Sequence, residues 1–112
     1  MLKICISILG ATRSIMPVIT FAHHKGGTGK TTACLNIGGF LKKNGKKVLI
    51  VDCDPQANAT SGLGVEPGTA KYDMYDVFMS GTEGFETVSL RNAILKTGAG
   101  PDLCPASLDL AG

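Results

Sequence analysis

Residues 25–32 read KGGTGKTT, and together with their flanking residues they indicate the fold that we expect for the chain. It follows a short, β-rich apolar run at residues 18–22, which is typical of a strand buried on both faces. After it, residues 31–43 carry apolar side chains at the spacing of one helical face, namely Ala33, Cys34, Ile37, Phe40 and Leu41. A strand, a glycine-rich turn over residues 23–29 and a helix in this order indicate the first part of a βαβ unit.

The residue types of this turn suit a phosphate group. Glycines at positions 26, 27 and 29 let consecutive backbone N–H groups turn inward around an anion, and the following helix presents its free N–H groups to the same place. Lys30 can reach the β- and γ-phosphates of a nucleotide, and the Thr31 hydroxyl can ligate Mg²⁺. The predicted phosphate loop therefore consists of Lys25, Gly26, Gly27, Thr28, Gly29, Lys30, Thr31 and Thr32.

The loop departs from the ordinary phosphate-loop pattern at one position. The pattern G-x-x-x-x-G-K-[ST] needs glycine at position 24, where this chain has His24. A second lysine, Lys25, stands at the head of the loop instead, and in this respect the loop resembles the deviant Walker A ATPases. The alternative interpretation is a glycine-rich turn that binds no nucleotide.

A second group of polar residues follows the next predicted strand. Residues 48–51 are apolar (VLIV), and the chain continues as DCDPQ, which places Asp52 and Asp54 at the end of the strand. Because a βαβ crossover makes its two strands parallel, we expect both strand tips at one edge of the sheet, near the phosphate loop. Mg²⁺ and an attacking water must be held there. A turn or cap role for the two carboxylates is the alternative, since Asp and Pro are common in turns.

The rest of the chain predicts shorter elements. Residues 57–71 are rich in Gly, Asn, Ser and Thr and indicate a loop, whereas residues 72–79 and 86–96 indicate two short helices. Residues 102–105 indicate a third strand. We therefore expect an α/β fold with a parallel, doubly wound P-loop sheet, shortened to about three strands.

Three glycines bear on the first helix. Gly38 and Gly39 weaken it by roughly 1 kcal/mol each, but they let it lie close against the sheet. Gly45 suits its C-terminal cap, beside two lysines that favour the negative end of the helix dipole.

Composition and charge exclude several classes of protein. The 112 residues suffice for one small domain, and 44% apolar with 18% charged residues describes a globular chain. A net charge of +2 is too small to argue for any particular partner. The chain has only two tyrosines, four phenylalanines and no tryptophan, so it offers little aromatic surface on which nucleic-acid bases could stack. No apolar run approaches the ~20 residues that cross a bilayer, so we expect no membrane partner.

The four cysteines stand singly in the sequence, without the spacing of metal ligands, and we interpret them as reduced thiols: Cys5, Cys34, Cys53 and Cys104.

The first fifteen residues need a separate interpretation. Residues 2–9 form a largely apolar stretch, but it is short for a secretory signal and no A-x-A cleavage pattern follows it. We favour residues 1–15 as an N-terminal extension from a mis-assigned start, with Met16 as the natural first residue, over an additional edge strand. Residues 16–112 then form the N-terminal part of a P-loop ATPase domain.

These motifs together resemble the ParA/Soj-type chromosome and plasmid partition ATPases. The matching segments are residues 25–32, 48–60 (VLIVDCDPQANAT), 61–64 (SGLG) and 103–112. The resemblance covers nearly everything from Pro17 onward. The continuation D-x-D-P-Q-x-N-x-T favours partition ATPases over their relatives that share the loop, the MinD-type division-site ATPases and the nitrogenase iron proteins.

The resemblance implies a role for each matching residue of the loop. Lys30 would bind the β- and γ-phosphates of ATP, Thr31 would ligate Mg²⁺, and Thr32 would lie near the α-phosphate. Lys25 would reach across a nucleotide-sandwich dimer to the ATP of the other subunit, where it would neutralise charge that develops during phosphoryl transfer.

The resemblance also implies roles for the two aspartates and for the whole protein. Asp54 would orient the attacking water, and Asp52 would support Mg²⁺ through its water shell. ATP would close a homodimer that binds DNA without sequence preference, and hydrolysis stimulated by a centromere-binding, ParB-type partner would release it. The protein would then be cytoplasmic and associated with the nucleoid.

Members of this family are considerably longer than this chain. Their later metal-binding strand, adenine pocket and DNA-binding basic residues have no counterpart in it, so we expect the N-terminal portion of a partition ATPase. One alternative is a non-catalytic nucleotide-binding fragment, in which the loop forms but no hydrolysis occurs. Another is a MinD-type membrane-cycling ATPase, although nothing here resembles its C-terminal amphipathic anchor.

Overall fold

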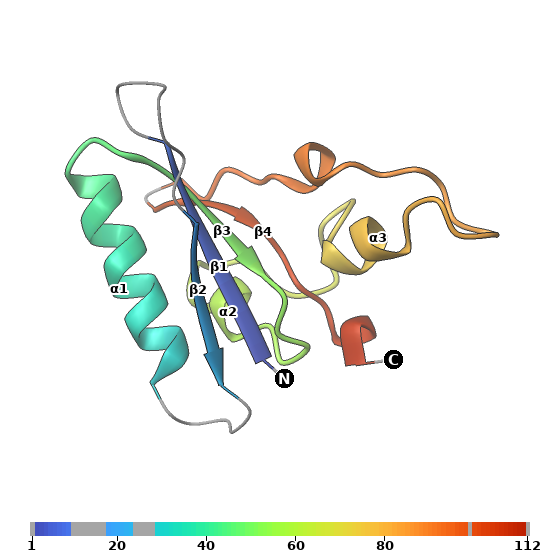
Figure 1. The fold of residues 1–112 in the computed structure, drawn as a ribbon, viewed down its shortest axis with the longest axis horizontal. Helices are drawn as coiled ribbons and strands as arrows, with labels where there is room; N and C mark the ends of the chain where they lie inside the picture. The colour runs from blue at the N-terminus through green and yellow to red at the C-terminus, as the bar shows by residue number, and fades with distance from the viewer. Residues whose placement is uncertain (1, 10–17, 24–28, 99, 112) are drawn as a thin grey trace.

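In a computed structural model, which describes residues 2–9, 18–23, 29–98 and 100–111, the backbone forms a four-stranded sheet (Figure 1). The strands are β1 (Leu2–Leu9), β2 (Val18–His23), β3 (Lys47–Asp52) and β4 (Asp102–Cys104). The α-helices are α1 (Lys30–Lys43), α2 (Asn58–Gly62) and α3 (Met74–Met79). Two short 3₁₀ helices, η1 (Leu90–Ala93) and η2 (Leu108–Ala111), complete the described part.

The strand order confirms the α/β class and adds a strand to the predicted sheet. The order is β2-β1-β3-β4, with β1 antiparallel to both of its neighbours and β3 parallel to β4. Because β2 and β3 both run opposite to β1, they are parallel to each other, as a βαβ unit requires. The two strands do not pair with each other directly, since β1 lies between them (Figure 1).

Strand β1 is a central strand. Ile6 lies opposite Ile19 of β2 on one side and opposite Ile50 of β3 on the other. Residues 2–9 thus form a strand, but between two neighbours rather than at an edge of the sheet. The interpretation of residues 1–15 as an extension that precedes a natural start at Met16 stays a prediction.

Helix α1 follows the sequence pattern closely and packs against the sheet at one glycine. The helix begins after Gly29, which has φ +82°, and ends before Gly45, which has φ +83°. A Cβ atom at Gly38 would lie 3.1 Å from Cδ1 of Ile50 and 3.3 Å from Cγ of Pro101. The predicted close approach is confirmed for Gly38, whereas a Cβ at Gly39 would meet nothing within 4 Å.

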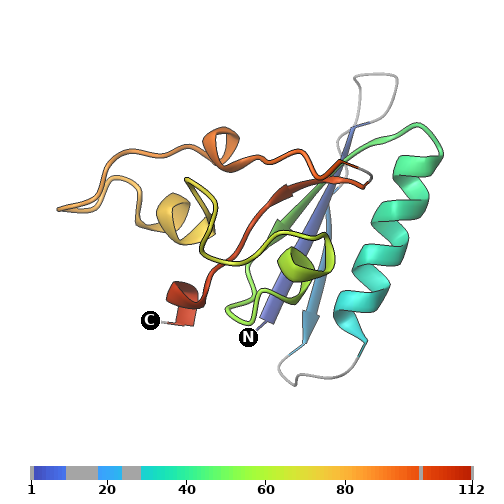
Figure 2. The same ribbon diagram turned by 180° about the vertical axis from the view of Figure 1, so that it is seen from behind.

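Side chains of β3 alternate between two apolar clusters, one on each face of the sheet. The first cluster joins β3 to α1, α2 and β4 through Cys34, Val48, Ile50, Ala59 and Leu103. The second is built on Met74, Ala93 and Cys104, against which the partly buried Leu49 and Val51 pack. In Figure 2, α2 lies in front of the sheet, whereas α3 lies to one side of it, beside the C-terminal segment. The doubly wound prediction therefore holds at β3, which is covered on both faces.

Two predicted segments differ from the structure. Residues 57–71 contain the short helix α2, which was expected as loop because polar turn formers dominate its composition. The predicted helix over residues 86–96 reduces to η1, because Leu95 exchanges two backbone hydrogen bonds with Leu103 of β4, of 2.7 and 2.9 Å. This pairing requires extended backbone and ends the helix.

The other sequence-based expectations concern thiols and membranes. Within the described part of the chain, Cys34, Cys53 and Cys104 form no disulfide, and burial raises the pKa of the Cys104 thiol to about 12. Such a thiol is protonated and unreactive near neutral pH. Among the described residues, no helix has the length and apolar character needed to span a membrane.

Candidate functional site

The turn after β3 carries both aspartates of the motif. Asp52 is the last residue of β3, and Asp54 lies two residues further on; both are fully buried. The backbone N–H of Asp54 donates to Oδ1 of Asp52 (3.0 Å), and the N–H of Gln56 donates to Oδ1 of Asp54 (2.9 Å). Each aspartate thus accepts a bond from the residue two positions later, which fixes a tight turn at the edge of the sheet.

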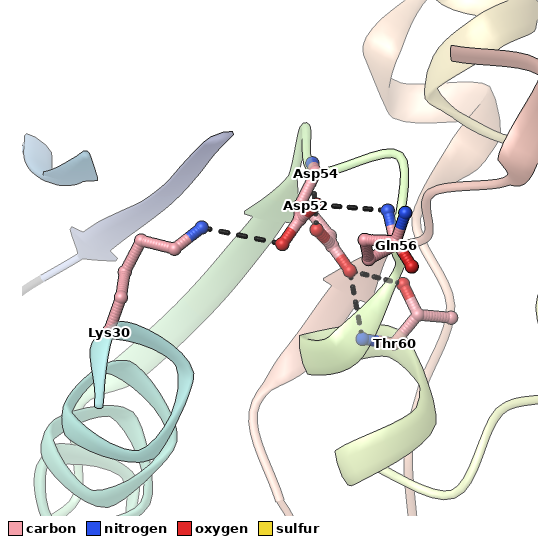
Figure 3. A network of polar contacts seen from close by, with 5 residues as sticks. All are labelled: Lys30, Asp52, Asp54, Gln56 and Thr60. Carbon is pink, nitrogen blue, oxygen red and sulfur yellow. Dashed lines mark hydrogen bonds and ion pairs between the residues drawn. The ribbon is translucent and has the colours of Figure 1, made fainter. Parts of the chain in front are cut away.

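The ammonium group of Lys30 reaches this turn from α1. Its Nζ lies 3.4 Å from Oδ2 of Asp54, and the two side chains are 8% and 1% exposed (Figure 3). Lys30 is the first residue of α1, so the contact joins the end of the predicted phosphate loop to the turn after β3. The sequence predicts this meeting at one sheet edge, and the structure brings the two residues together even though β1 separates their strands.

Asp52 lies in different surroundings. Its Oδ2 accepts from both the backbone N–H (2.9 Å) and the hydroxyl (2.7 Å) of Thr60, so three hydrogen bonds reach this carboxylate (Figure 3). Burial raises the pKa of Asp52, and the nearby charge of Asp54 acts in the same direction, whereas the hydrogen bonds from Thr60 and Asp54 lower it. Burial has the larger effect, so the pKa lies above its ordinary value.

The phosphate loop is described only at its C-terminal end. Gly29 adopts a left-handed conformation, and its carbonyl accepts from the N–H of Ala33 (2.9 Å), which closes the first turn of α1. Thr31 is half-buried and Thr32 is exposed. The remaining predicted loop residues lie outside the described part of the chain: Lys25, Gly26, Gly27 and Thr28.

One buried polar residue at this site was not singled out by sequence reasoning. Thr60 belongs to the segment that resembles partition ATPases, but it lies in a stretch that composition indicates as loop. Its hydroxyl contacts Asp52 and also accepts from the backbone N–H of Ala106, 46 residues away (2.9 Å). The signal available in the sequence was its place in the D-x-D-P-Q-x-N-x-T continuation, since a contact over this separation leaves no local pattern.

A family model described as "AAA domain" matches residues 16–112. The chain belongs to this family. The match takes in the predicted phosphate loop, both aspartates and Thr60, and it begins after residues 1–15.

Curated relatives of this AAA-domain chain include partition proteins. It is 39% identical over 95 residues to the sporulation initiation inhibitor protein Soj of Bacillus subtilis, a match that covers 85% of the chain and 36% of Soj. It is 41% identical over 96 residues to the chromosome-partitioning ATPase Soj of Treponema pallidum, covering 84% of the chain and 34% of that protein. The resemblance to ParA/Soj-type proteins is thereby confirmed. The chain spans about a third of the length of these relatives.

Solved structures extend the comparison to bound nucleotides. Cobyrinic acid a,c-diamide synthase from Mycobacterium smegmatis is similar to this chain with a TM-score of 0.68 and 36% sequence identity. The similarity covers 81% of this chain and 35% of the synthase. That enzyme has been solved with ADP and magnesium and with an ATP analogue and magnesium.

Proposed function

We propose that this chain carries the phosphate-binding and water-activating elements of a Mg²⁺-dependent P-loop ATPase of the partition type. The observation that carries the proposal is the 3.4 Å contact between Nζ of Lys30 and Oδ2 of Asp54, both nearly inaccessible to solvent. It joins the cation suited to a nucleotide phosphate and the carboxylate suited to orient water. The partition relatives and the nucleotide-bound synthase structures support the same function.

Lys30 and Asp54 would act one after the other, Lys30 when ATP binds and Asp54 when water attacks. In the structure, the Lys30 ammonium is paired with Asp54. The β- and γ-phosphates of ATP offer it several negative oxygens, so Lys30 would turn to them, aided by the free N–H groups of the first turn of α1. Asp54 would then be free to accept a hydrogen bond from the attacking water and hold it in line with the γ-phosphate.

The oxygen donors at this edge fit Mg²⁺. Thr31 is half-buried near the start of α1, and the carboxylate of Asp52 is buried at the end of β3. Mg²⁺ is suited to such a site, because it keeps several waters and uses few protein ligands. Thr31 would ligate it and Asp52 would support it through water. When bound, the ion neutralises negative charge on the phosphates.

The whole protein would act as a switch. The proposal includes an ATP-dependent homodimer in which Lys25 of each subunit contacts the nucleotide of the other, binding of DNA without sequence preference, and a centromere-binding, ParB-type partner that stimulates hydrolysis. The protein would be cytoplasmic and associated with the nucleoid. The partition proteins among the relatives support this assignment.

Measurements of nucleotide binding and of turnover test the proposed roles of Lys30 and Asp54 separately. Lys30→Ala should weaken binding of Mg²⁺-ATP by at least about tenfold, because it removes the ammonium that pairs with the phosphates. Asp54→Ala should leave affinity within about threefold and abolish phosphate release. Isothermal titration calorimetry and a phosphate-release assay on the chain give both quantities.

The matched control is Lys96→Ala. This lysine is 84% exposed and pairs with Asp102 at 2.9 Å, so its loss removes a cation and an ion pair away from the site. It should change neither affinity nor turnover. Equal ATP affinity in the wild type and Lys30→Ala would overturn the phosphate role, whereas ATP binding without Lys30-dependent phosphate release would favour the non-catalytic fragment.

A further inference from the structure

The buried hydroxyl of Thr60 has two partners outside helix α2. Its Oγ1 donates to Oδ2 of Asp52 (2.7 Å) and accepts from the N–H of Ala106 (2.9 Å), and all three residues are 0% exposed. A hydroxyl can fill both roles at once, because it has one donor and two acceptor sites. Thr60 therefore ties the end of β3 to the segment that follows β4.

The bonds continue from Asp52 to the turn that holds Asp54. Asp52 uses Oδ2 for Thr60 and Oδ1 for the backbone N–H of Asp54. Figure 3 shows the order of contacts from Thr60 through Asp52 to Asp54 and Lys30. If Asp52 turned about its side-chain torsions, the N–H of Asp54 would lose its acceptor.

The turn after β3 alone does not account for the hydrogen bonds that connect Thr60, Asp52 and Asp54. Bonds between residues two positions apart, such as Asp54 to Asp52, form in many short turns. The bonds of Thr60 span 8 and 46 residues and are fully buried, where an unpaired polar group is costly. The turn also leads into Ala57, a buried alanine with φ +54°, a conformation that persists only where its surroundings hold it.

We propose that Thr60 is a positioning residue of this site: its hydroxyl fixes Asp52, and through Asp52 it fixes the turn that aims Asp54 at Lys30. The catalytic part of this inference rests on the proposed ATPase function. Thr60 makes no contact with Lys30 or with the carboxylate of Asp54 among the hydrogen bonds of the described residues, so it acts through Asp52.

The test compares Thr60→Val, which keeps the shape of the side chain without the hydroxyl, with Thr60→Ser, which keeps the hydroxyl. Amide hydrogen exchange measured by NMR should speed up about tenfold at Asp54 and Ala106 in Thr60→Val, because their acceptors are lost or freed to move. Phosphate release should fall about tenfold, with ATP affinity within about twofold of the wild type. Thr60→Ser should restore most of both properties.

Thr82→Val is the control, because Thr82 is an exposed threonine whose hydroxyl bonds to the carbonyl of Met79. It should leave exchange and turnover unchanged. Wild-type exchange at Asp54 in Thr60→Val would overturn the proposal. So would a loss of protection spread evenly over α1, β3 and β4 in both Thr60 variants, which would make Thr60 merely structural. If the wild type released no phosphate while the exchange pattern held, the hydrolytic function would fail and the positioning role would stand.

Discussion

Asp52 and Asp54 are two residues apart, yet their surroundings give them different properties. Asp54 lies beside the ammonium group of Lys30, which compensates its charge. Asp52 has no such cation in the ion pairs of the described residues; backbone and hydroxyl donors surround it instead, and burial raises its pKa. These surroundings agree with the roles that we propose, Asp54 as the carboxylate that orients water and Asp52 as the one that holds the turn.

The raised pKa of Asp52 predicts a pH dependence of stability. In the unfolded chain Asp52 titrates near its ordinary value of 3.8, whereas the folded protein keeps the proton to higher pH. In the window between the two values the folded state binds more protons, so the free energy of unfolding falls as pH rises through it. The Asp52→Asn variant lacks this fall.

Urea unfolding of the wild type and Asp52→Asn between pH 4 and pH 7 measures this contribution. The variant should be less stable at low pH, because one acceptor oxygen is lost, and the difference in free energy of unfolding from the wild type should narrow as pH rises through the window. Asp73, whose pKa burial also raises, is present in both proteins and cancels in the difference. A constant difference at every pH would contradict the prediction.

Among the elements, helix α1 approaches the sheet closely at one glycine. Gly38 faces two buried side chains, Ile50 of β3 and Pro101, which would have to shift by a few tenths of an ångström to admit a methyl group. Gly39, its neighbour, has open space around it. The same residue type therefore serves close packing at one position and only weakens the helix at the next.

Alanine substitution separates these two effects. Gly39→Ala should raise the free energy of unfolding by about 0.5–1 kcal/mol, the ordinary gain in helix propensity. Gly38→Ala should lower it by about 1–2 kcal/mol, because the methyl group would press on Ile50 and the rigid Pro101 ring. Urea unfolding followed by circular dichroism gives both values. Equal stabilisation by the two substitutions would show that α1 shifts freely on the sheet.

The sequence predicts best the helices and strands that a local pattern of apolar residues specifies. The periodicity of residues 31–43 and the apolar run at residues 48–51 identify α1 and β3, which place Lys30 and Asp54 at one edge. The rule that βαβ strands are parallel was enough for this meeting, because it depends on strand direction rather than on direct pairing. Helix α2 was not predicted, because it has only five residues and its Thr60 bonds to Asp52 in a tertiary contact that local composition does not reveal.

At the scale of the whole molecule, β1 holds the two halves of the βαβ unit together. Strand β2 pairs with β1 and with no other strand of the described sheet, and β1 in turn pairs with β3. The order of strands depends on long-range pairing, which local sequence patterns do not encode. This is why the central place of residues 2–9 could not be predicted from their composition.

A proline in β1 tests whether that strand supports the fold. Ile6 has a partner on each side, Ile19 and Ile50, so its backbone N–H faces a neighbouring strand and proline would remove a ladder bond. Ile6→Pro should lower the free energy of unfolding by about 3 kcal/mol and Tm by about 10 °C or more, whereas the control Ile6→Val should change Tm by a few degrees at most. Thermal unfolding followed by circular dichroism measures both. An unchanged Tm in Ile6→Pro would mean that the sheet does not need β1, as the interpretation of residues 1–15 as an extension implies.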